Sequence, residues 1–274
     1  MIKIIDTDDA NIKKTLLNGR LQSDSLIDES KNTNTNIVRR GFNEEDRKWF
    51  SDKEIVRLKE AQEELLWLLD RGYKMKPTCE FIGNVYQFSL RQRNALQRAT
   101  SSKFQCNNRK ALLLSTLAME NKEMYIDGFN LIITLEVAMS QGVLILCNDG
   151  TIRDIAGLRG TYSIIDKTTK VLELIGKALR ELKISNVKIF LDAPVSNSGR
   201  LKSKILSSSE GWTCCTEVEL IPNPDTVLSK MERIVTSDSI ILDSCKSWFN
   251  LGRYILENHV KDARVIDLSG KINN

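Results

Sequence analysis

The stretch EMYIDGFN, residues 123–130, decides the fold. Met124, Tyr125 and Ile126 predict the end of a short buried strand, and Asp127 follows at its carboxyl end with a glycine that lets the chain turn. Ligands and chemistry gather at the carboxyl ends of strands in an open α/β sheet, so Asp127 is a candidate site residue. An Asp-Gly pair is also an ordinary turn. The prediction gains weight because a strand followed by Asp recurs twice downstream.

Strands and helices alternate from this stretch to the end of the chain. Apolar runs predict strands over 123–127, 187–191, 213–220, 233–236 and 264–268, and a further strand in a hairpin over 143–150. The largest helix between them is expected over 162–182. Strands that alternate with helices favour a doubly wound, mostly parallel sheet with helices on both faces. The predicted fold class is therefore α/β, with this domain over 121–274.

Residues 39–120 have a helical pattern instead, which predicts a small all-α module. Ser51 and Glu54 have the spacing of a capping box, and Ser89 is expected to cap a later helix. Two short helices joined through QFS are typical of a helix-turn-helix. The alternative is a small bundle with a solvated basic face. Residues 1–38 are polar and poor in aromatic residues, so we expect a flexible extension there.

Composition excludes several classes of protein. The chain has 274 residues, one histidine (His259) and six cysteines without CxxC spacing, so a multi-histidine metal site and a zinc ribbon are both disfavoured. It has no apolar run long enough to span a membrane and no secretory signal, so we expect a cytoplasmic protein without a membrane partner. Seven basic residues and one acidic residue occupy 76–110, which favours a nucleic-acid partner. The basic side chains that would contact it on the later helix are Arg91, Arg93 and Arg98.

Three predicted strands are followed by a carboxylate, namely Asp127, Asp192 and Asp238. In a doubly wound sheet these carboxyl ends converge where the strand order reverses. Three carboxylates there would repel one another unless a cation lies among them. Oxygen ligands without His or Cys suit Mg²⁺ or Mn²⁺, which can activate water and stabilise charge on a phosphoryl group. The sequence therefore predicts a metal-assisted phosphodiester hydrolase, or a protein that inherited such a pocket.

Neighbouring residues supply further candidates. Asn130 could orient a ligand, and Glu136, Asp154 and Asp243 are additional carboxylates. After Asp192, an anion-binding turn and its neighbouring cation are expected from Ser196, Asn197, Ser198 and Arg200. Arg153 and Arg159, in the loop after the hairpin, could contact substrate. The structural alternative is that Ser198 and Asp238 simply cap the helices that follow them.

The segments IDGFNL (126–131), FLDAPVSNSG (190–199) and TSDSIILD (236–243) resemble the PIN/NYN-like nuclease superfamily. RRGFNEEDRKWF (39–50), the helices to about 102 and the C-terminal half resemble a prokaryotic family of unknown function that joins a short helical module to a PIN-like domain. The resemblance runs from about residue 39 to the end of the chain. It implies an RNase that depends on Mg²⁺ or Mn²⁺ and uses Asp127, Asp192 and Asp238, with Asn130 at the position of the family's Asn. It also implies a further acidic ligand, for which Glu136 and Asp154 compete.

Two functions follow as hypotheses. The first is a metal-dependent ribonuclease whose helical module holds nucleic acid and whose Arg159 or Arg200 balances phosphate charge. The second is a non-catalytic nucleic-acid-binding or adaptor protein with a degenerate pocket. A phosphatase of the haloacid-dehalogenase type is disfavoured because Phe129 stands where that chemistry needs a second Asp. The oligomeric state stays open, with a homodimer as one option.

Overall fold

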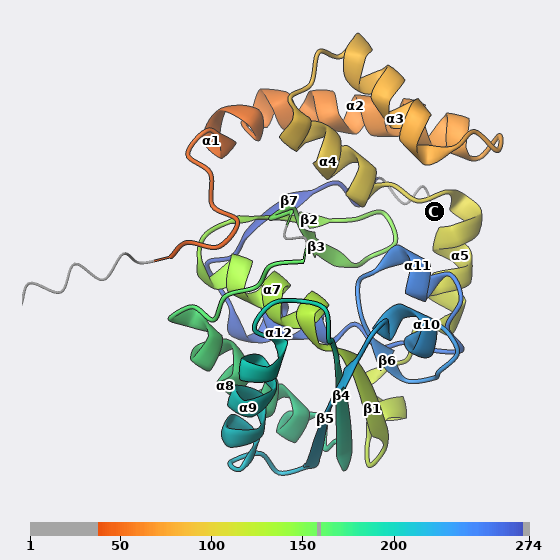
Figure 1. Ribbon diagram of the computed structural model, residues 1–274. Coiled ribbons are helices and arrows are strands. Elements are labelled where there is room, and N and C mark those ends of the chain that lie inside the picture. Colours follow the sequence, from red (N-terminus) through yellow and green to blue (C-terminus); the bar gives the residue numbers. More distant parts are fainter. Residues whose placement is uncertain (1–37, 158–159, 271–274) are drawn as a thin grey trace, which may run out of the picture. The chain divides into compact units, whose positions relative to one another are not determined.

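The computed structural model describes residues 38–157 and 160–270, which belong to one compact unit over 37–274 (Figure 1). The extension expected over 1–38 lies outside these residues except for its last position. The described part of the chain contains no helix that is both long and apolar enough to cross a membrane. Its architecture is mixed α/β with a parallel sheet, which confirms the coarse fold class.

The described chain begins with helices, as predicted. Their bounds are α1 Asp46–Trp49, α2 Asp52–Leu69, α3 Met75–Val85, α4 Leu90–Ala99, α5 Lys103–Leu112 and α6 Thr116–Met119. Ser89 caps α4 through a capping box with Gln92, as expected for that serine. The capping box expected at Ser51 is wrong, because that side chain makes no cap bond. The carboxylate of Glu54 is bound by Arg57 and Gln92 instead.

A four-stranded parallel sheet follows the helices. It contains β1 Glu123–Asp127, β4 Asn186–Asp192, β5 Cys215–Ile221 and β6 Ile234–Val235, in the order β5-β4-β1-β6. Side chains alternate between its faces, so Val187, Ile189 and Leu191 join one core while Phe190 joins another. The helices that fill the connections are α7 Gly128–Met139, α8 Lys167–Glu181, α9 Ser198–Ser209, α10 Pro224–Leu228, α11 Ser239–Leu242 and α12 Leu251–His259.

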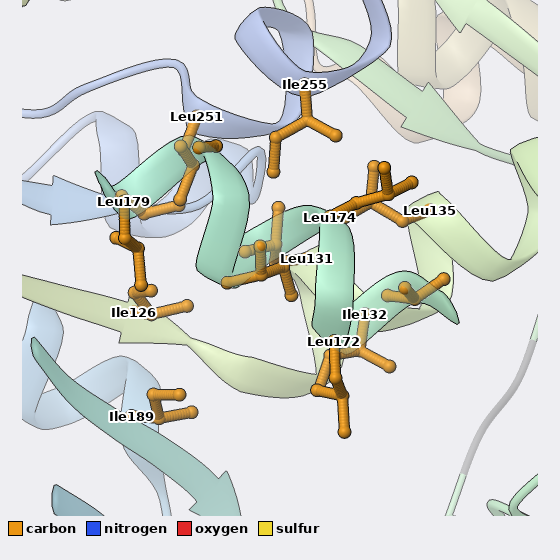
Figure 2. Close-up of a cluster of buried hydrophobic side chains, with 14 of the residues drawn as sticks. Ile126, Leu131, Ile132, Leu135, Leu172, Leu174, Leu179, Ile189, Leu251 and Ile255 are labelled. Atoms are coloured by element: carbon orange, nitrogen blue, oxygen red, sulfur yellow. The ribbon is translucent and has the colours of Figure 1, made fainter. Parts of the chain in front are cut away.

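The largest core lies between this sheet and the helices α7, α8 and α12. Figure 2 shows Ile126 and Ile189 of the sheet together with leucines and isoleucines of these helices. Gly128 opens α7 directly behind β1, and a Cβ atom there would meet the Ile189 side chain at 2.8 Å and the Phe190 carbonyl oxygen at 3.0 Å. The glycine is therefore needed for the close approach of α7 to β4 rather than for a sharp turn.

The remaining strands form a second sheet, where the sequence suggested a single one. Its strands are β2 Val143–Leu146, β3 Ile152–Asp154 and β7 Arg264–Asp267, in the order β3-β2-β7. One face of β2 joins the first core through Leu144, while Val143 and Ile145 join a core that includes residues of α2, α3 and α4. Strand β2 pairs with β3 and β7 and packs against both α7 and α4.

Candidate functional site

All four strands of the parallel sheet point the same way, and an aspartate follows each at the same edge. Asp127 ends β1, Asp192 ends β4, Asp225 lies in the first turn of α10 after β5, and Asp238 follows β6. All four line one pocket of about 680 Å³. Asp225 was not among the residues expected at the site, although the Asn-Pro-Asp run after a predicted strand indicates a helix start at this edge.

The strand order places two of these residues at a reversal. Numbered along the chain, the sheet strands stand in the order third, second, first, fourth, so the connections change direction between β1 and β6. Ligands of open α/β sheets bind outside the carboxyl ends of the strands at such a switch point. Asp127 and Asp238 flank it.

Asp127 is the most buried of the four, with 7% of its surface exposed. Its Oδ1 atom accepts the backbone N–H of Asn130 at 3.3 Å, and its Oδ2 atom accepts the hydroxyl of Thr236 at 2.8 Å. The pKa of Asp127 is raised to about 7: burial raises it most, these two hydrogen bonds lower it, and the nearby carboxylates of Asp238 and Asp225 raise it. The site therefore holds a carboxyl group whose charge is unfavourable without a nearby cation.

Asp238 and Asn130 hold the end of β6 in place. The Oδ1 atom of Asp238 accepts the backbone N–H groups of Ile240 at 2.8 Å and Ile241 at 3.3 Å, so Asp238 caps α11. The side-chain oxygen of Asn130 accepts the N–H of Ser237 at 2.8 Å and its hydroxyl at 2.9 Å. The capping role considered for Asp238 is thus observed, and Asn130 fixes the segment beside it.

Capping does not account for Asp192 or for the charge of the group. Asp192 is half-buried at the end of β4, and burial raises the pKa of its carboxyl. Loss of water and the carboxylates of Asp238 and Asp192 also raise the pKa of Asp225. Within 38–157 and 160–270, no basic side chain forms an ion pair with Asp127, Asp192, Asp225 or Asp238. A bound cation would therefore offset the mutual repulsion of these four carboxylates.

The donor atoms fit a hard divalent cation. The pocket offers carboxylate, amide and hydroxyl oxygens, and these suit Mg²⁺ or Mn²⁺. In the described residues, no three His, Cys, Asp or Glu side chains are placed so that they could hold one ion together. Mg²⁺ commonly keeps several waters and takes only one or two protein carboxylates, with substrate phosphate completing the shell. The arrangement therefore fits an ion held partly through water.

Of the three additional carboxylates expected as ligands, only Asp154 lines the pocket. Glu136 is fully buried elsewhere, where its carboxylate pairs with Arg40 at 2.7 Å and accepts the Tyr162 hydroxyl at 2.9 Å. Asp243 binds Arg109 Nε and Gln105 Nε2, each at 2.7 Å, outside the pocket lining. Glu136 and Asp243 are therefore removed from the candidate ligands, since buried or half-buried partners already bind their oxygens.

The turn over 196–198, which was expected to bind an anion, forms hydrogen bonds within the protein instead, chiefly with the backbone of Tyr162. Asn197 Nδ2 donates to the carbonyl of Tyr162 at 2.6 Å, and Ser196 Oγ accepts the N–H of Tyr162 at 3.0 Å. Ser198 donates to the Ala193 carbonyl at 3.3 Å. Arg200 is exposed and does not line the pocket. Arg159, the other expected phosphate contact, lies outside the described residues.

The arginines of α4 divide into two groups. Arg91 forms an ion pair with Asp46 and donates to the Gly41 carbonyl at 2.6 Å. Arg93 donates to Asn84 Oδ1 and to the Phe88 carbonyl, each at 2.8 Å. These contacts correct the interpretation of both residues as nucleic-acid contacts, because their guanidinium groups hold the helices together. Arg98 does line the pocket.

Two buried arginines that line the pocket, Arg109 and Arg153, belong to an ion network that was not predicted, although Arg153 itself was a candidate substrate contact. Arg109 of α5 is fully buried and pairs with Asp149 and Asp243. Arg153 of β3 pairs with Asp149 at 2.6 Å and donates to the Ser237 carbonyl at 2.6 Å. Burial alone would raise the pKa of Asp149, but the two arginines and hydrogen bonds from Thr151 lower it. The Asp-Gly turn at 149–150 was the available signal, but sequence alone does not pair it with α5.

Comparisons with known proteins agree on a relationship but assign no activity. The family described as "Domain of unknown function (DUF5616)" matches residues 116–254, and "Protein of unknown function (DUF434)" matches residues 57–111. An uncharacterized protein of Methanocaldococcus jannaschii is 34% identical over 187 residues, which cover 68% of this chain and 89% of that protein. No solved structure matches the chain significantly.

Proposed function

The chain belongs to the DUF5616 family, and we propose that it is a metal-dependent ribonuclease. The observation that carries this proposal is the set of four strand-end aspartates that line one pocket without a basic partner among the described residues. Hydrolysis of a phosphodiester requires an activated water and compensation of phosphate charge, and bound Mg²⁺ or Mn²⁺ would supply both.

The residues of the chain have distinct roles in this proposal. Asp127, Asp192 and Asp238 hold the ion partly through its water molecules, and Asp225 and Asp154 add negative charge and further acceptors for these waters. Asn130 and Thr236 position the carboxylates through the hydrogen bonds described above. The raised pKa of Asp127 means that ion binding and proton release are linked near neutral pH.

We also propose that the parallel sheet is PIN/NYN-like. Support comes from the place of the three motif segments, since Asp127, Asp192 and Asp238 all line the pocket at the carboxyl edge. The reversal of strand order between β1 and β6 is the arrangement expected of a doubly wound sheet. RNA is the proposed polymer because the resemblance implies it and because the chain carries a net charge of +4.

A second function, binding of nucleic acid without turnover, is favoured by two specific observations. Asp127 and Asp238 each cap a helix, and the described residues contain no ready three-ligand group. A chain that kept these aspartates for capping alone would bind RNA with a steep dependence on salt and no dependence on metal.

A cleavage assay tests the first function against the second. End-labelled single-stranded and structured RNA would be incubated with Mn²⁺, Mg²⁺ or EDTA, using the wild type, Asp127→Asn and Asp192→Asn. Asp166→Asn is the matched control, because Asp166 stands at the start of α8 but lies outside the pocket. We expect metal-dependent cleavage that both pocket variants abolish and the control retains. Binding without cleavage in any metal would favour the second function, and cleavage by Asp127→Asn would refute the site.

A further inference from the structure

The pocket has a second part, built by the helices that precede the sheet. Residues of the α2–α3 connection, of α4 and of α5 complete the lining beside the carboxylates. Among the polar and aromatic lining residues, the three that precede the sheet by most residues along the chain are Tyr73, Gln97 and Arg98. The helical segment is thus part of the same site as the strand-end aspartates.

Buried arginines fix this part of the lining to the carboxyl edge. Arg153 donates to the Ser237 carbonyl at 2.6 Å and to the Arg98 carbonyl at 2.7 Å, so one side chain joins the end of β6 to α4. Arg109 joins α5 to Asp243, which directly follows α11, and α5 and α11 are drawn side by side in Figure 1. The two parts of the pocket are therefore held in one arrangement before any ligand arrives.

Tyr73, Gln97 and Arg98 are available to a ligand, unlike Arg91 and Arg93. Tyr73 is 60% exposed, and in the described chain neither its hydroxyl nor the side chain of Gln97 forms a hydrogen bond with another residue. The Arg98 side chain is 44% exposed; its Nη1 donates to the Asp154 carbonyl at 2.8 Å and lies 3.9 Å from the Asp154 carboxylate. An aromatic ring with an amide and a guanidinium can stack on a planar group and hydrogen-bond its edge.

We infer that Tyr73, Gln97 and Arg98 form a nucleobase subsite of this pocket, with Tyr73 stacking on the base and Gln97 and Arg98 bonding its polar edge. The inference rests on the proposed function, because the carboxylate edge would then act on the phosphodiester next to that base. A pocket of about 680 Å³ is in the range that holds one small ligand. The base must therefore be unpaired, since a duplex cannot place a single base there without opening.

Binding measurements test the subsite separately from catalysis. The full chain would be titrated into a short fluorescein-labelled single-stranded RNA in EDTA, with the same RNA as a duplex for comparison. Tyr73→Ala and Gln97→Ala are the test variants, and Tyr73→Phe keeps the ring. Phe81→Ala and Asn94→Ala are matched controls, because both residues are exposed on α3 and α4 and lie outside the pocket lining. Circular dichroism melts would verify that each variant is folded.

We expect Tyr73→Ala to weaken binding of the single strand roughly tenfold, the effect of losing one stacked base. Tyr73→Phe should bind nearly as the wild type, Gln97→Ala less tightly, and both controls unchanged. Three results would overturn the inference. Tyr73→Ala could bind the single strand as tightly as the wild type, Phe81→Ala could lose as much affinity as Tyr73→Ala, or the duplex could bind more tightly than the single strand. Binding that depends on Tyr73 without any metal-dependent cleavage would leave the subsite standing and refute the nuclease function instead.

Discussion

Replacing Asp127 by asparagine should make the protein more stable in alkaline solution. Burial keeps the pKa of this carboxyl at about 7 in the folded chain, against 3.8 when it is exposed. At about 1.4 kcal/mol for each pKa unit, that difference corresponds to about 4 kcal/mol of destabilisation once the group is ionised. The asparagine side chain would carry no charge, and its amide oxygen could still accept the Asn130 N–H as a helix cap.

The dependence on pH has a definite sign. Between pH 3.8 and about 7 the folded chain keeps a proton on Asp127 that the unfolded chain has lost, so wild-type stability falls as pH rises through this window. From about pH 5 to about pH 9 the loss from this group is about 3 kcal/mol. The variant lacks this contribution, and the difference between the two proteins should level off above pH 7.

Urea denaturation in EDTA at several pH values measures the effect, with the unfolding free energy taken from the linear dependence on denaturant. Asp166→Asn is again the control, because Asp166 is exposed and should leave the slope with pH unchanged. Parallel pH profiles of wild type and Asp127→Asn would refute the account of Asp127 as a strained, buried charge. A variant that is less stable than wild type at pH 9 would refute it equally.

Three further outcomes are expected. Asp192→Asn should weaken Mg²⁺ binding about tenfold, which removes about 1.4 kcal/mol of the stabilisation that Mg²⁺ gives the wild type. Thermal melts at a fixed Mg²⁺ concentration measure this. A Mg²⁺-induced rise in melting temperature equal to that of the wild type would exclude Asp192 as a ligand. Arg153→Met should cost about 3–5 kcal/mol in urea titrations, because it leaves the buried Asp149 with one partner fewer. Glu136→Gln should cost a similar amount, about 3–5 kcal/mol, by leaving Arg40 without its carboxylate. The folded fraction of that last variant should still cleave RNA at the wild-type rate, and a loss of cleavage would return Glu136 to the site.

The sequence predicted the parallel strands well because their pattern is local. The predicted bounds of β1 match the observed ones, and those of β4 agree within one residue at each end, since short apolar runs bounded by turn residues carry that information. Because parallel strands run in the same direction, Asp127, Asp192 and Asp238 were then expected together at the carboxyl ends of the strands. Their shared pocket is therefore the part of the site that sequence could reach.

The rest depended on partners that are distant along the chain. Glu136 and Asp154 had the same standing in the sequence, and only the packing of Arg40 and Tyr162 against Glu136 separates them. Arg91 was expected to face nucleic acid, but its partner Asp46 lies 45 residues earlier. The exposed or buried state of a charged side chain is set by such contacts, which periodicity along a single helix does not record.

The core shared by the helices and the second sheet has a consequence for which parts of this chain can be separated from one another. Val143, Ile145 and Ile266 pack in one cluster with Leu58 and Leu96 of the helical segment. A gene fragment that encodes only residues 121–274 would leave this apolar face of the sheet in water, and its product should aggregate. The segments that match DUF434 and DUF5616 thus share one hydrophobic core in this chain, and each should need the other in order to fold.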